Sequence, residues 1–339
     1  MTDLPETMRA HVVESFGDPD SFVERELDRP DPGPNEALVA VEATSVNPVD
    51  YKVRRAGKPL APDPPAVLHG DLAGTVVATG PGVESVDVGD EVYGCVGGVN
   101  GTTGTLAEYA VADAASLARK PPSLSMREAA ALPLVTITAW EGLHDRVGVS
   151  AGDSVLVHGG AGGVGHVAVQ LAARAGATVT ATASTKRKRE QSRTLGATNA
   201  VDYRQPVDEY VSEHAPGGFD VVFDSVGSAA DNLETSFAAA GLNGDVVTTM
   251  SRGEHDLTDV HTKGLSLHTV YMLIPLLHDR QEGKARHGEI LRRAAAMVES
   301  GKLEPLLDDE RFGFDEPAAA HRRAESGDCI GKVTLARSE

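Results

Sequence analysis

The stretch that decides the fold is SVLVHGGAGGVGHVAVQLAARAGA, residues 154–177. It begins with a short apolar, valine-rich run, which is typical of a buried strand, and it ends in an alanine-rich segment typical of a helix. Five glycines lie between these two parts, within residues 159–165. A strand, a glycine-rich turn and a helix in this order predict the start of a βαβ unit.

The glycine-rich turn predicts a binding site for a dinucleotide. Its glycines follow the spacing GxGxxG, which allows a tight turn and lets the backbone approach a pyrophosphate closely. The following helix offers free N–H groups and the positive end of its dipole to the phosphates. The predicted contact residues are Gly160, Gly162, Gly163, Val164 and Gly165.

The end of the next expected strand favours NADPH over NADH. A site specific for NAD usually carries an acidic residue about twenty positions after the turn, where it binds the ribose 2′-hydroxyl. Ala183 and Ser184 stand there instead, followed by the basic run TKRKR at 185–189. In an acidic protein, such a run suits the charge of a 2′-phosphate.

Two kinds of pattern divide the chain. From Met8 to about Lys120, short alternating segments are separated by clusters of Pro, Gly, Asn and Asp, which predicts a β-rich lobe. From about Pro121, strands alternate with helical segments, which predicts a parallel sheet built from βαβ units. The strands expected in this sheet span 154–159, 178–184, 199–203, 219–227 and 244–250.

The last part of the chain, after about Leu273, has its own pattern. It contains an amphipathic helical segment at 287–302, a shorter one at 316–326 and a closing strand at 331–337. Spacing alone leaves open whether this tail caps the parallel sheet or returns to the first lobe.

Composition argues against several classes of partner. Fifty acidic residues face thirty-one basic ones, and the formal net charge is −19. This charge disfavours nucleic acids and anionic membranes as partners, because their phosphates would be repelled. The N-terminal segment lacks the basic start and apolar run of a signal peptide, so we expect a cytoplasmic protein. The longest uncharged stretch, 154–173, contains the five glycines and is not expected to span a membrane.

Motifs along the whole chain resemble the medium-chain dehydrogenase/reductase superfamily, and within it the zinc-independent quinone oxidoreductases that include the ζ-crystallins. The motifs are SVNPVDYK (45–52), GDLAGTVVATGPGV (70–83), VGDEVYG (88–94), EAAALPLVTITAWEGL (128–143), VLVHGGAGGVGHVAVQLA (155–172), LGATNAVDY (195–203) and IGKVTL (330–335).

The resemblance implies an α/β fold with two domains. One is a Rossmann domain with a doubly wound parallel sheet, and the other is a GroES-like, β-rich catalytic domain formed from both chain ends. The implied parts are 1–125 for the start of the catalytic domain, 126–272 for the NADPH-binding domain and 273–339 for the return to the catalytic domain. A homodimer or homotetramer is implied as well.

The resemblance also assigns residues to the cofactor. It places Ser184, Lys188 and Tyr203 around the 2′-phosphate, and it places Thr138 near the nicotinamide. For Thr138, a packed core position is the alternative. The strand end over which the dinucleotide lies is assigned to Val226 and Gly227.

The positions that hold the catalytic zinc in the alcohol dehydrogenases of this superfamily carry other residues here. Asn47 stands in place of the cysteine, and Gly70 and Asp71 stand in place of the histidine and glutamate. Cys95 has no cysteine near it for a structural zinc, which needs about four ligands. His69 lies one position too early, and a shifted metal site is the least favoured interpretation. We therefore expect an enzyme without zinc.

Without a Lewis acid, conjugated acceptors are the easiest to reduce, because an enolate or quinol anion spreads the charge that the hydride leaves. In SVNPVDYK, the amide of Asn47 and the phenol of Tyr51 are candidate catalytic donors, although each also suits a packing role. Asp50 is expected to cap the helical turn after Pro48. The expected function is NADPH-dependent reduction of quinones or α,β-unsaturated carbonyl compounds. An enoyl-thioester reductase and a non-catalytic NADPH-binding protein are the alternatives.

The acidic surface predicts that salt stabilises the protein. At ~1 M salt the screening length falls to ~3 Å, so repulsion among the acidic side chains is largely removed. We expect thermal unfolding in molar potassium chloride to occur at a clearly higher midpoint than at low ionic strength. Equal midpoints would instead indicate an ordinary acidic protein without salt adaptation.

Overall fold

The computed structural model describes residues 4–99, 101–226, 230–250 and 253–337, and the chain forms two compact units. The first unit comprises Met1–Leu134, Leu273–Gly301 and Pro305–Glu339, and the second comprises Val135–Met272 with Lys302–Glu304. The chain leaves the first unit after Leu134. The reason is that α2 (Met126–Ala130) packs on strands of the first unit.

The first unit is built on two antiparallel sheets. The smaller has the order β2-β1-β4, and the larger has the order β15-β16-β3-β5-β6-β8, with β7 paired to β3. The strands are β1 (Thr7–Val13), β2 (Phe22–Asp28), β3 (Glu36–Ser45), β4 (Ala66–Val67), β5 (Asp71–Thr79), β6 (Glu91–Cys95), β7 (Tyr109–Asp113), β8 (Ala118–Arg119), β15 (Phe312–Gly313) and β16 (Thr334–Ala336).

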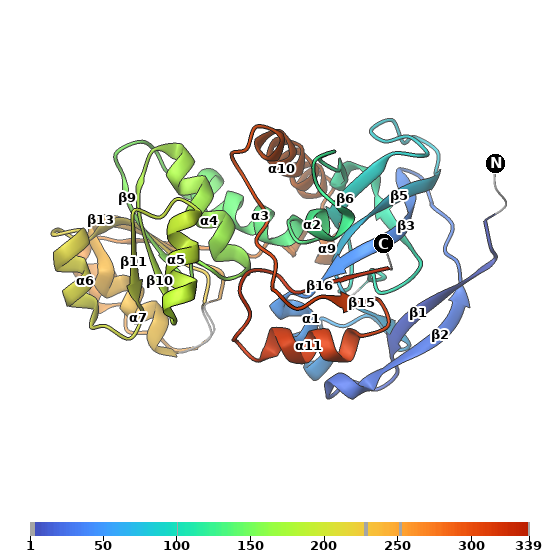
Figure 1. Cartoon of the computed structure of the whole chain (residues 1–339), viewed down its shortest axis with the longest axis horizontal. Helices are drawn as coiled ribbons and strands as arrows, with labels where there is room; N and C mark the ends of the chain where they lie inside the picture. The colour runs from blue at the N-terminus through green and yellow to red at the C-terminus, as the bar shows by residue number, and fades with distance from the viewer. Residues whose placement is uncertain (1–3, 100, 227–229, 251–252, 338–339) are drawn as a thin grey trace. The chain divides into compact units, whose positions relative to one another are not determined.

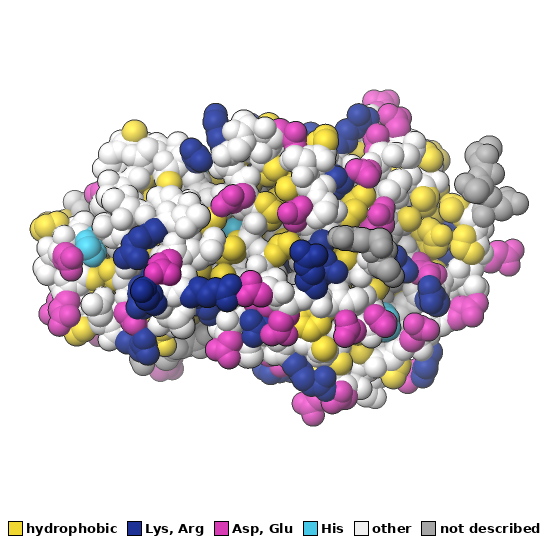
Figure 2. Space-filling view, in the orientation of Figure 1, with side chains coloured by type: hydrophobic (Ala, Val, Ile, Leu, Met, Phe, Trp, Pro, Cys, Tyr) yellow, Lys and Arg dark blue, Asp and Glu magenta, His cyan; other side chains and the backbone are white. Residues whose placement is uncertain are grey.

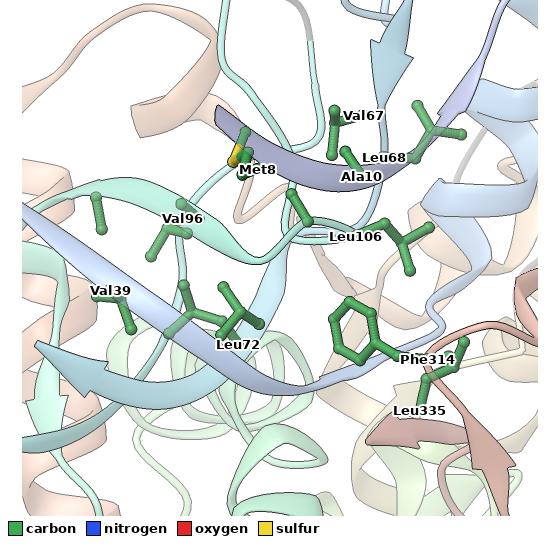
Figure 3. Close-up of a cluster of buried hydrophobic side chains, with 14 of the residues drawn as sticks. Met8, Ala10, Val39, Val67, Leu68, Leu72, Val96, Leu106, Phe314 and Leu335 are labelled. Atoms are coloured by element: carbon green, nitrogen blue, oxygen red, sulfur yellow. The ribbon is translucent and has the colours of Figure 1, made fainter. Parts of the chain in front are cut away.

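The C-terminal tail belongs to the first unit, which settles the alternative left open by its spacing. The strand β16 pairs antiparallel with β3, and Thr334 lies opposite Ser45 (Figure 1). Figure 3 shows the consequence in the core, where Phe314 and Leu335 of the tail pack in one cluster with Leu72 and Leu106. The expected β-rich domain formed from both chain ends is confirmed.

Five helices in the described residues complete the first unit. They are α1 (Pro48–Ala56), α2, α9 (Ile274–Leu277), α10 (Gln281–Glu299) and α11 (Pro317–Glu325). The long helix α10 packs beside β8, and the phenol of Tyr93 on β6 donates a 2.6 Å hydrogen bond to the Leu291 carbonyl. Besides the pairing of β16 with β3, this bond is a second contact between the C-terminal part of the chain and the N-terminal sheet.

The second unit contains the expected parallel sheet, with the order β11-β10-β9-β12-β13-β14, in which β14 is a sixth strand that the sequence did not predict. Its strands are β9 (Ser154–His158), β10 (Thr178–Ala183), β11 (Asn199–Asp202), β12 (Phe219–Asp224), β13 (Ala240–Thr248) and β14 (Ser266–Thr269). The chain runs outward from β9 to β11 and then returns to β12 on the other side of β9. A topological switch point therefore lies between β9 and β12, where sheets of this kind bind their ligands.

Helices connect the strands of the second unit. They are α3 (Pro133–Trp140), which enters the unit from α2 and continues as a π-helical turn (Glu141–Val147), α4 (Gly163–Ala175), α5 (Lys186–Thr194), α6 (Val207–His214), α7 (Ala230–Ala239) and α8 (Thr258–Lys263). The helix α4 packs on β9 and β10, and α5 packs on β10 and β11. These contacts bring the N-termini of both helices to the switch-point edge.

Charged side chains of both signs cover the visible surface. Figure 2 shows acidic side chains spread over it, with basic ones among them, in keeping with the net charge of −19. Within the described part of the chain, no helix combines the length and the apolar character needed to cross a bilayer.

Two histidines form a buried pair in the first unit. The Nε2 atoms of His69 and His321 lie 2.8 Å apart, and His69 Nδ1 lies 3.2 Å from the Thr44 hydroxyl. His69 has φ of 70°, a conformation uncommon for residues other than glycine. Burial lowers the pKa of His69, and burial together with Arg54 lowers the pKa of His321 to about 3. Both rings are therefore neutral in the folded protein at neutral pH.

This pair predicts acid sensitivity. A histidine with a folded-state pKa below its unfolded value of about 6.5 binds its proton only after unfolding, so stability falls as pH drops from about 6.5 towards 3. Replacing His321 by Gln removes one of the two histidines that bind a proton only after unfolding. We expect the unfolding free energy of the parent to fall more steeply with decreasing pH than that of the variant, with a slope difference that grows from about 0.7 kcal/mol per pH unit at pH 6.5 to about 1.4 near pH 5.

Urea unfolding at constant molar salt measures these slopes. The matched control is His261→Gln, because His261 is exposed on α8 and its replacement should leave the slope of the parent unchanged. If the unfolding free energies of the parent and of His321→Gln change with pH in parallel, the conclusion that burial lowers the pKa of His321 is wrong.

Candidate cofactor site and active site

The turn between β9 and α4 is shaped by glycines that admit no side chain. A Cβ at Gly165 would lie 2.1 Å from the Gly159 carbonyl oxygen, and one at Gly160 would lie 2.6 Å from the Cβ of Ala181. These glycines let α4 and β10 approach the turn closely. Gly162 differs, because a Cβ there would meet only the Gly159 oxygen, at 3.1 Å. Packing restricts position 162 less than positions 160 and 165, whereas the close approach of a ligand to the backbone would favour glycine there.

The same turn presents unused backbone donors. Gly162 is the N-cap of α4, and the first helical hydrogen bond runs from the His166 N–H to the Gly162 carbonyl. The N–H groups of Gly163, Val164 and Gly165 in the first turn therefore have no partner within the helix. These are the groups that the sequence assigned to a pyrophosphate.

The carboxyl ends of β9, β10 and β12 meet at this edge of the sheet. Ser184 directly follows β10, and Val226 follows β12 by two residues, with 48% of its surface exposed. The Val226 N–H donates to the Asp224 carboxylate at 3.0 Å, which fixes the strand end. Gly227, the other residue predicted here, lies outside the described residues.

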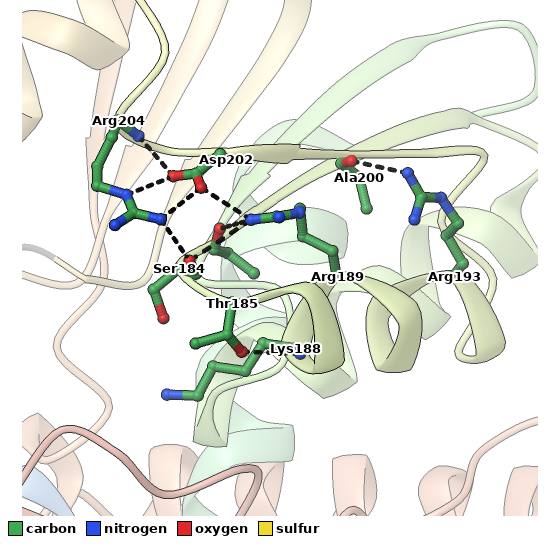
Figure 4. Close-up of polar contacts among 9 residues, drawn as sticks. Ser184, Thr185, Lys188, Arg189, Arg193, Ala200, Asp202 and Arg204 are labelled. Atoms are coloured by element: carbon green, nitrogen blue, oxygen red, sulfur yellow. Dashed lines mark hydrogen bonds and ion pairs between the residues drawn. The ribbon is translucent and has the colours of Figure 1, made fainter.

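The end of β10 carries the groups expected for a 2′-phosphate. Figure 4 shows the Ser184 hydroxyl and the Lys188 ammonium pointing to the same side of the loop that opens α5. The backbone of this loop is fixed because Thr185 caps α5 and accepts the Lys188 N–H at 3.2 Å. Tyr203, also predicted here, directly follows β11 and is 58% exposed.

The basic run does not act as one cluster. Arg189 donates to the Asp202 carboxylate at 3.0 Å, and Arg193 on the same helix donates to the Ala200 carbonyl at 2.9 Å (Figure 4). Both guanidinium groups thus fasten α5 to β11. Lys186 pairs with Glu190 one turn later along the helix. Lys188 is the member of the run that Figure 4 places beside Ser184.

Arg204 is a candidate that the sequence analysis missed. Its guanidinium donates twice to the Asp202 carboxylate, at 2.6 and 2.8 Å, and once to the Ser184 carbonyl, at 2.9 Å. These bonds hold it beside the predicted phosphate site, and they hold the pKa of Asp202 well below its usual range. The basic residue one position after Tyr203 was the available signal.

Thr138 lies on α3 in the second unit and is 5% exposed. This burial agrees with the packing alternative that the sequence left open. Its assignment to the nicotinamide remains a prediction.

In the first unit, the motif SVNPVDYK forms the end of β3 and the start of α1. Asp50 accepts the Asn47 N–H at 2.6 Å, so it closes the first turn of α1 as expected. Burial raises the pKa of Asp50 to about 7. Asn47 is only 1% exposed, and its amide nitrogen donates to the Asp71 carboxylate at 2.7 Å.

Tyr51 has a different environment. Its ring packs against the core of the first unit, and the Arg55 guanidinium lies 5.8 Å from the ring centre. Burial raises the pKa of the phenol, so the group stays protonated at neutral pH. Among the described residues its hydroxyl has no hydrogen-bond partner, which leaves the phenol able to donate to a ligand.

The residues at the positions of the zinc ligands bind one another instead. Asp71 accepts hydrogen bonds from Asn47 and from the Ser45 hydroxyl, and His69 contacts His321. Across the described ranges, no three or more His, Cys, Asp or Glu side chains are grouped so that they could hold a metal ion.

Two family models match the chain. Residues 33–122 match the alcohol dehydrogenase GroES-like domain, and residues 195–335 match the domain described as zinc-binding dehydrogenase. The first match lies within the first unit. The second covers parts of both units, including the phosphate-side residue Arg204.

Curated relatives match over most of the chain. A 2-methylene-furan-3-one reductase of Solanum lycopersicum and the chloroplastic NADPH-dependent alkenal/one oxidoreductase of Arabidopsis thaliana are each 36% identical, over 98% of this chain and 80% of their own. A chloroplast envelope quinone oxidoreductase homolog of Arabidopsis thaliana is 31% identical, over 90% of this chain and 91% of its own.

Solved structures share the fold. An alcohol dehydrogenase superfamily protein from Novosphingobium aromaticivorans has a TM-score of 0.91 and 43% identity, covering 98% of this chain and 100% of its own. A mycobacterial protein complexed with NADPH has a TM-score of 0.84 and 27% identity, covering 97% and 99%. With the fold, the glycine-rich turn and these relatives in agreement, the chain belongs to the medium-chain dehydrogenase/reductase superfamily, together with quinone and alkenal oxidoreductases.

Proposed function

We propose that the protein is an NADPH-dependent oxidoreductase that reduces α,β-unsaturated carbonyl compounds or quinones. The observation that carries the cofactor is the set of groups at the end of β10, where Ser184, Lys188 and Arg204 lie together and no acidic side chain occupies position 184. The relatives named as an NADPH-dependent alkenal/one oxidoreductase and as a 2-methylene-furan-3-one reductase support the acceptor class.

The residues fit NADPH in two places. The free N–H groups at the start of α4 suit the pyrophosphate, and the cations and hydroxyl at the end of β10 suit the 2′-phosphate through charge-assisted hydrogen bonds. When bound, NADPH supplies the hydride.

The reaction we propose is a two-electron reduction. The hydride adds to the β-carbon of the enone, the C=C π electrons move to form an enolate, and a proton then adds at the α-carbon. In sum, NADPH, a proton and the enone give NADP⁺ and the saturated ketone. A quinone takes a hydride and a proton in the same way to give the quinol.

The chain's own contribution is to stabilise negative charge on the acceptor oxygen. Tyr51 offers a protonated phenol whose hydroxyl has no hydrogen-bond partner in the described part of the chain, and Asn47 offers an amide N–H. Such donors can stabilise an enolate or a quinol anion, because the charge of these anions is delocalised. A localised alkoxide would need stronger stabilisation. We therefore propose that the reaction proceeds without zinc, with Tyr51 and Asn47 as the donors.

Oxidation of NADPH in the presence of a panel of enones, quinones and one enoyl thioester tests the proposal. We expect turnover with an enone or a quinone. Binding of NADPH without turnover of any acceptor would favour a non-catalytic protein, and turnover of the thioester alone would favour a thioester reductase. Gel filtration in molar salt tests the assembly that we propose, a homodimer or homotetramer.

Arg204 should select NADPH over NADH. Replacing it by Ala removes a cation next to the 2′-phosphate and leaves the Asp202 carboxylate less neutralised. We expect the KM for NADPH to rise about tenfold, because a charge-assisted hydrogen bond is lost. The KM for NADH should change little, since NADH has no 2′-phosphate.

Steady-state kinetics with both cofactors measure this effect. Lys186→Ala is the matched control, because Lys186 belongs to the same basic run and its side chain is 86% exposed. An equal rise in KM for both cofactors would show that Arg204 supports only the local structure.

Tyr51 and Asn47 should affect turnover rather than cofactor binding. We expect Tyr51→Phe and Asn47→Ala each to lower kcat by about tenfold or more, since each removes one donor to the developing anion. The dissociation constant of NADPH should stay within a few fold of the parent.

Tyr109→Phe on β7 serves as the control for loss of a phenol elsewhere in the same unit. Full activity of both Tyr51→Phe and Asn47→Ala would reduce the motif SVNPVDYK to a structural turn.

A further inference from the structure

Lys332, in the C-terminal tail, is a buried cation beside the candidate active-site motif. It lies two residues before β16, and only 3% of its surface is exposed. Its ammonium donates to the Val46 carbonyl at 3.0 Å and to Asn47 Oδ1, and it lies 3.7 Å from Asp71 Oδ2.

The backbone around Lys332 is fixed on both sides. The Lys332 N–H donates to the Leu306 carbonyl at 2.8 Å, and its own carbonyl accepts the Asp308 N–H at 2.9 Å. The next residue, Val333, accepts the Val46 N–H at 2.9 Å. The ammonium is thus held at the end of β3 by hydrogen bonds that do not involve its own charge.

Stability gives a poor reason for a charge at this place. Burial lowers the pKa of Lys332, while Asp71 and Asp50 oppose that shift. Buried ion pairs can often be replaced by apolar side chains of similar volume without loss of stability, because desolvation offsets the attraction. A methionine could fill much of the same space. The charge therefore points to a task other than packing.

The contacts of Lys332 indicate that this task is to orient the side-chain amide of Asn47. An ammonium can only donate and a carboxylate can only accept, so Lys332 selects the oxygen of the Asn47 carboxamide and Asp71 selects its nitrogen. The reversed amide would place its N–H groups against the ammonium and its oxygen against the carboxylate. The side-chain amide is therefore locked in one orientation.

These contacts leave one N–H of the Asn47 amide without an assigned partner among the described residues. The Asn47 amide has two N–H bonds, and the Asp71 carboxylate uses one of them. Hydrogen bonds that follow one another through a polar group strengthen each other, so a cation on the carboxamide oxygen makes the remaining N–H a stronger donor. Asp71 is itself fixed by the Ser45 hydroxyl at 2.7 Å and by the Leu134 N–H at 2.9 Å.

We infer that Lys332 is a positioning residue of the reaction: it orients and polarises the Asn47 carboxamide, whose remaining N–H stabilises negative charge on the acceptor oxygen. This inference rests on the proposed function and adds to it a residue from the opposite end of the chain. Lys332 acts through Asn47, since its ammonium is enclosed by Val46, Asn47 and Asp71.

A double-mutant cycle tests the inference. Lys332→Met should lower kcat by about tenfold, with the KM for NADPH within twofold of the parent. Because Lys332 acts through Asn47, the double variant Lys332→Met/Asn47→Ala should be no slower than Asn47→Ala alone, within about twofold. Independent roles would instead multiply the two losses, to about a hundredfold.

Controls separate this effect from a loss of structure. Each variant is checked by thermal unfolding and by NADPH binding, and Lys302→Met tests removal of an exposed lysine from the same C-terminal part of the chain. If Lys332→Met does not fold, the same cycle with Lys332→Gln decides, since Gln keeps a donor for Asn47 without the charge.

The outcomes distinguish this inference from the proposed function. A parent that oxidises NADPH with no enone or quinone overturns both. An active parent in which Lys332→Met keeps full kcat, or in which the losses of the two single variants multiply, overturns the role of Lys332 alone.

Discussion

The pairing of β16 with β3 is the constraint on which the first unit depends. It joins residues almost three hundred positions apart, with Thr334 opposite Ser45 and Ala336 opposite Ala43. It adds β16 and β15 to the larger sheet, brings Phe314 and Leu335 into the core, and sets Lys332 against Asn47. Side chains alternate between the two faces of a strand. A shift of the β16 register by one residue would therefore move each of its side chains to the opposite face of the sheet. The register that places Phe314 and Leu335 in the core therefore also brings Lys332 to Asn47 and Asp71.

The two candidate sites share one feature: each contains an Asp carboxylate that is paired with basic side chains and hydrogen-bond donors. In the second unit, Asp202 accepts from Arg189 and Arg204, so an acidic side chain beside the expected 2′-phosphate is more than neutralised. In the first unit, Asp71 accepts from the Asn47 amide and lies 3.7 Å from the Lys332 ammonium. In a chain with a net charge of −19, the local sign at each site depends on these few basic residues.

Sequence reasoning predicted the fold well and the site in part. The glycine-rich turn and the alternation of strands and helices identified the parallel sheet because they are local patterns. The strand β2 was not predicted, since FVERELD carries charges on an exposed pair with β1 and lacks an apolar face. A local pattern does not give the direction of a long side chain. The sequence could therefore not show that Arg189 fastens α5 to β11, that Lys186 pairs with Glu190, or that Lys188 lies beside Ser184. Lys332 was missed because its partners lie at the other end of the chain.

A fixed ammonium and a metal ion impose different limits on an active site. A metal with an open position binds the acceptor oxygen directly and can stabilise a localised alkoxide. The Lys332 ammonium is buried and directs its hydrogens at protein oxygens, so its charge reaches a substrate only through the Asn47 amide. Transmission through one amide gives a weaker, strongly directional donor. Such a donor matches an acceptor whose own conjugation carries most of the charge, and on this ground we propose enones and quinones rather than simple ketones as acceptors.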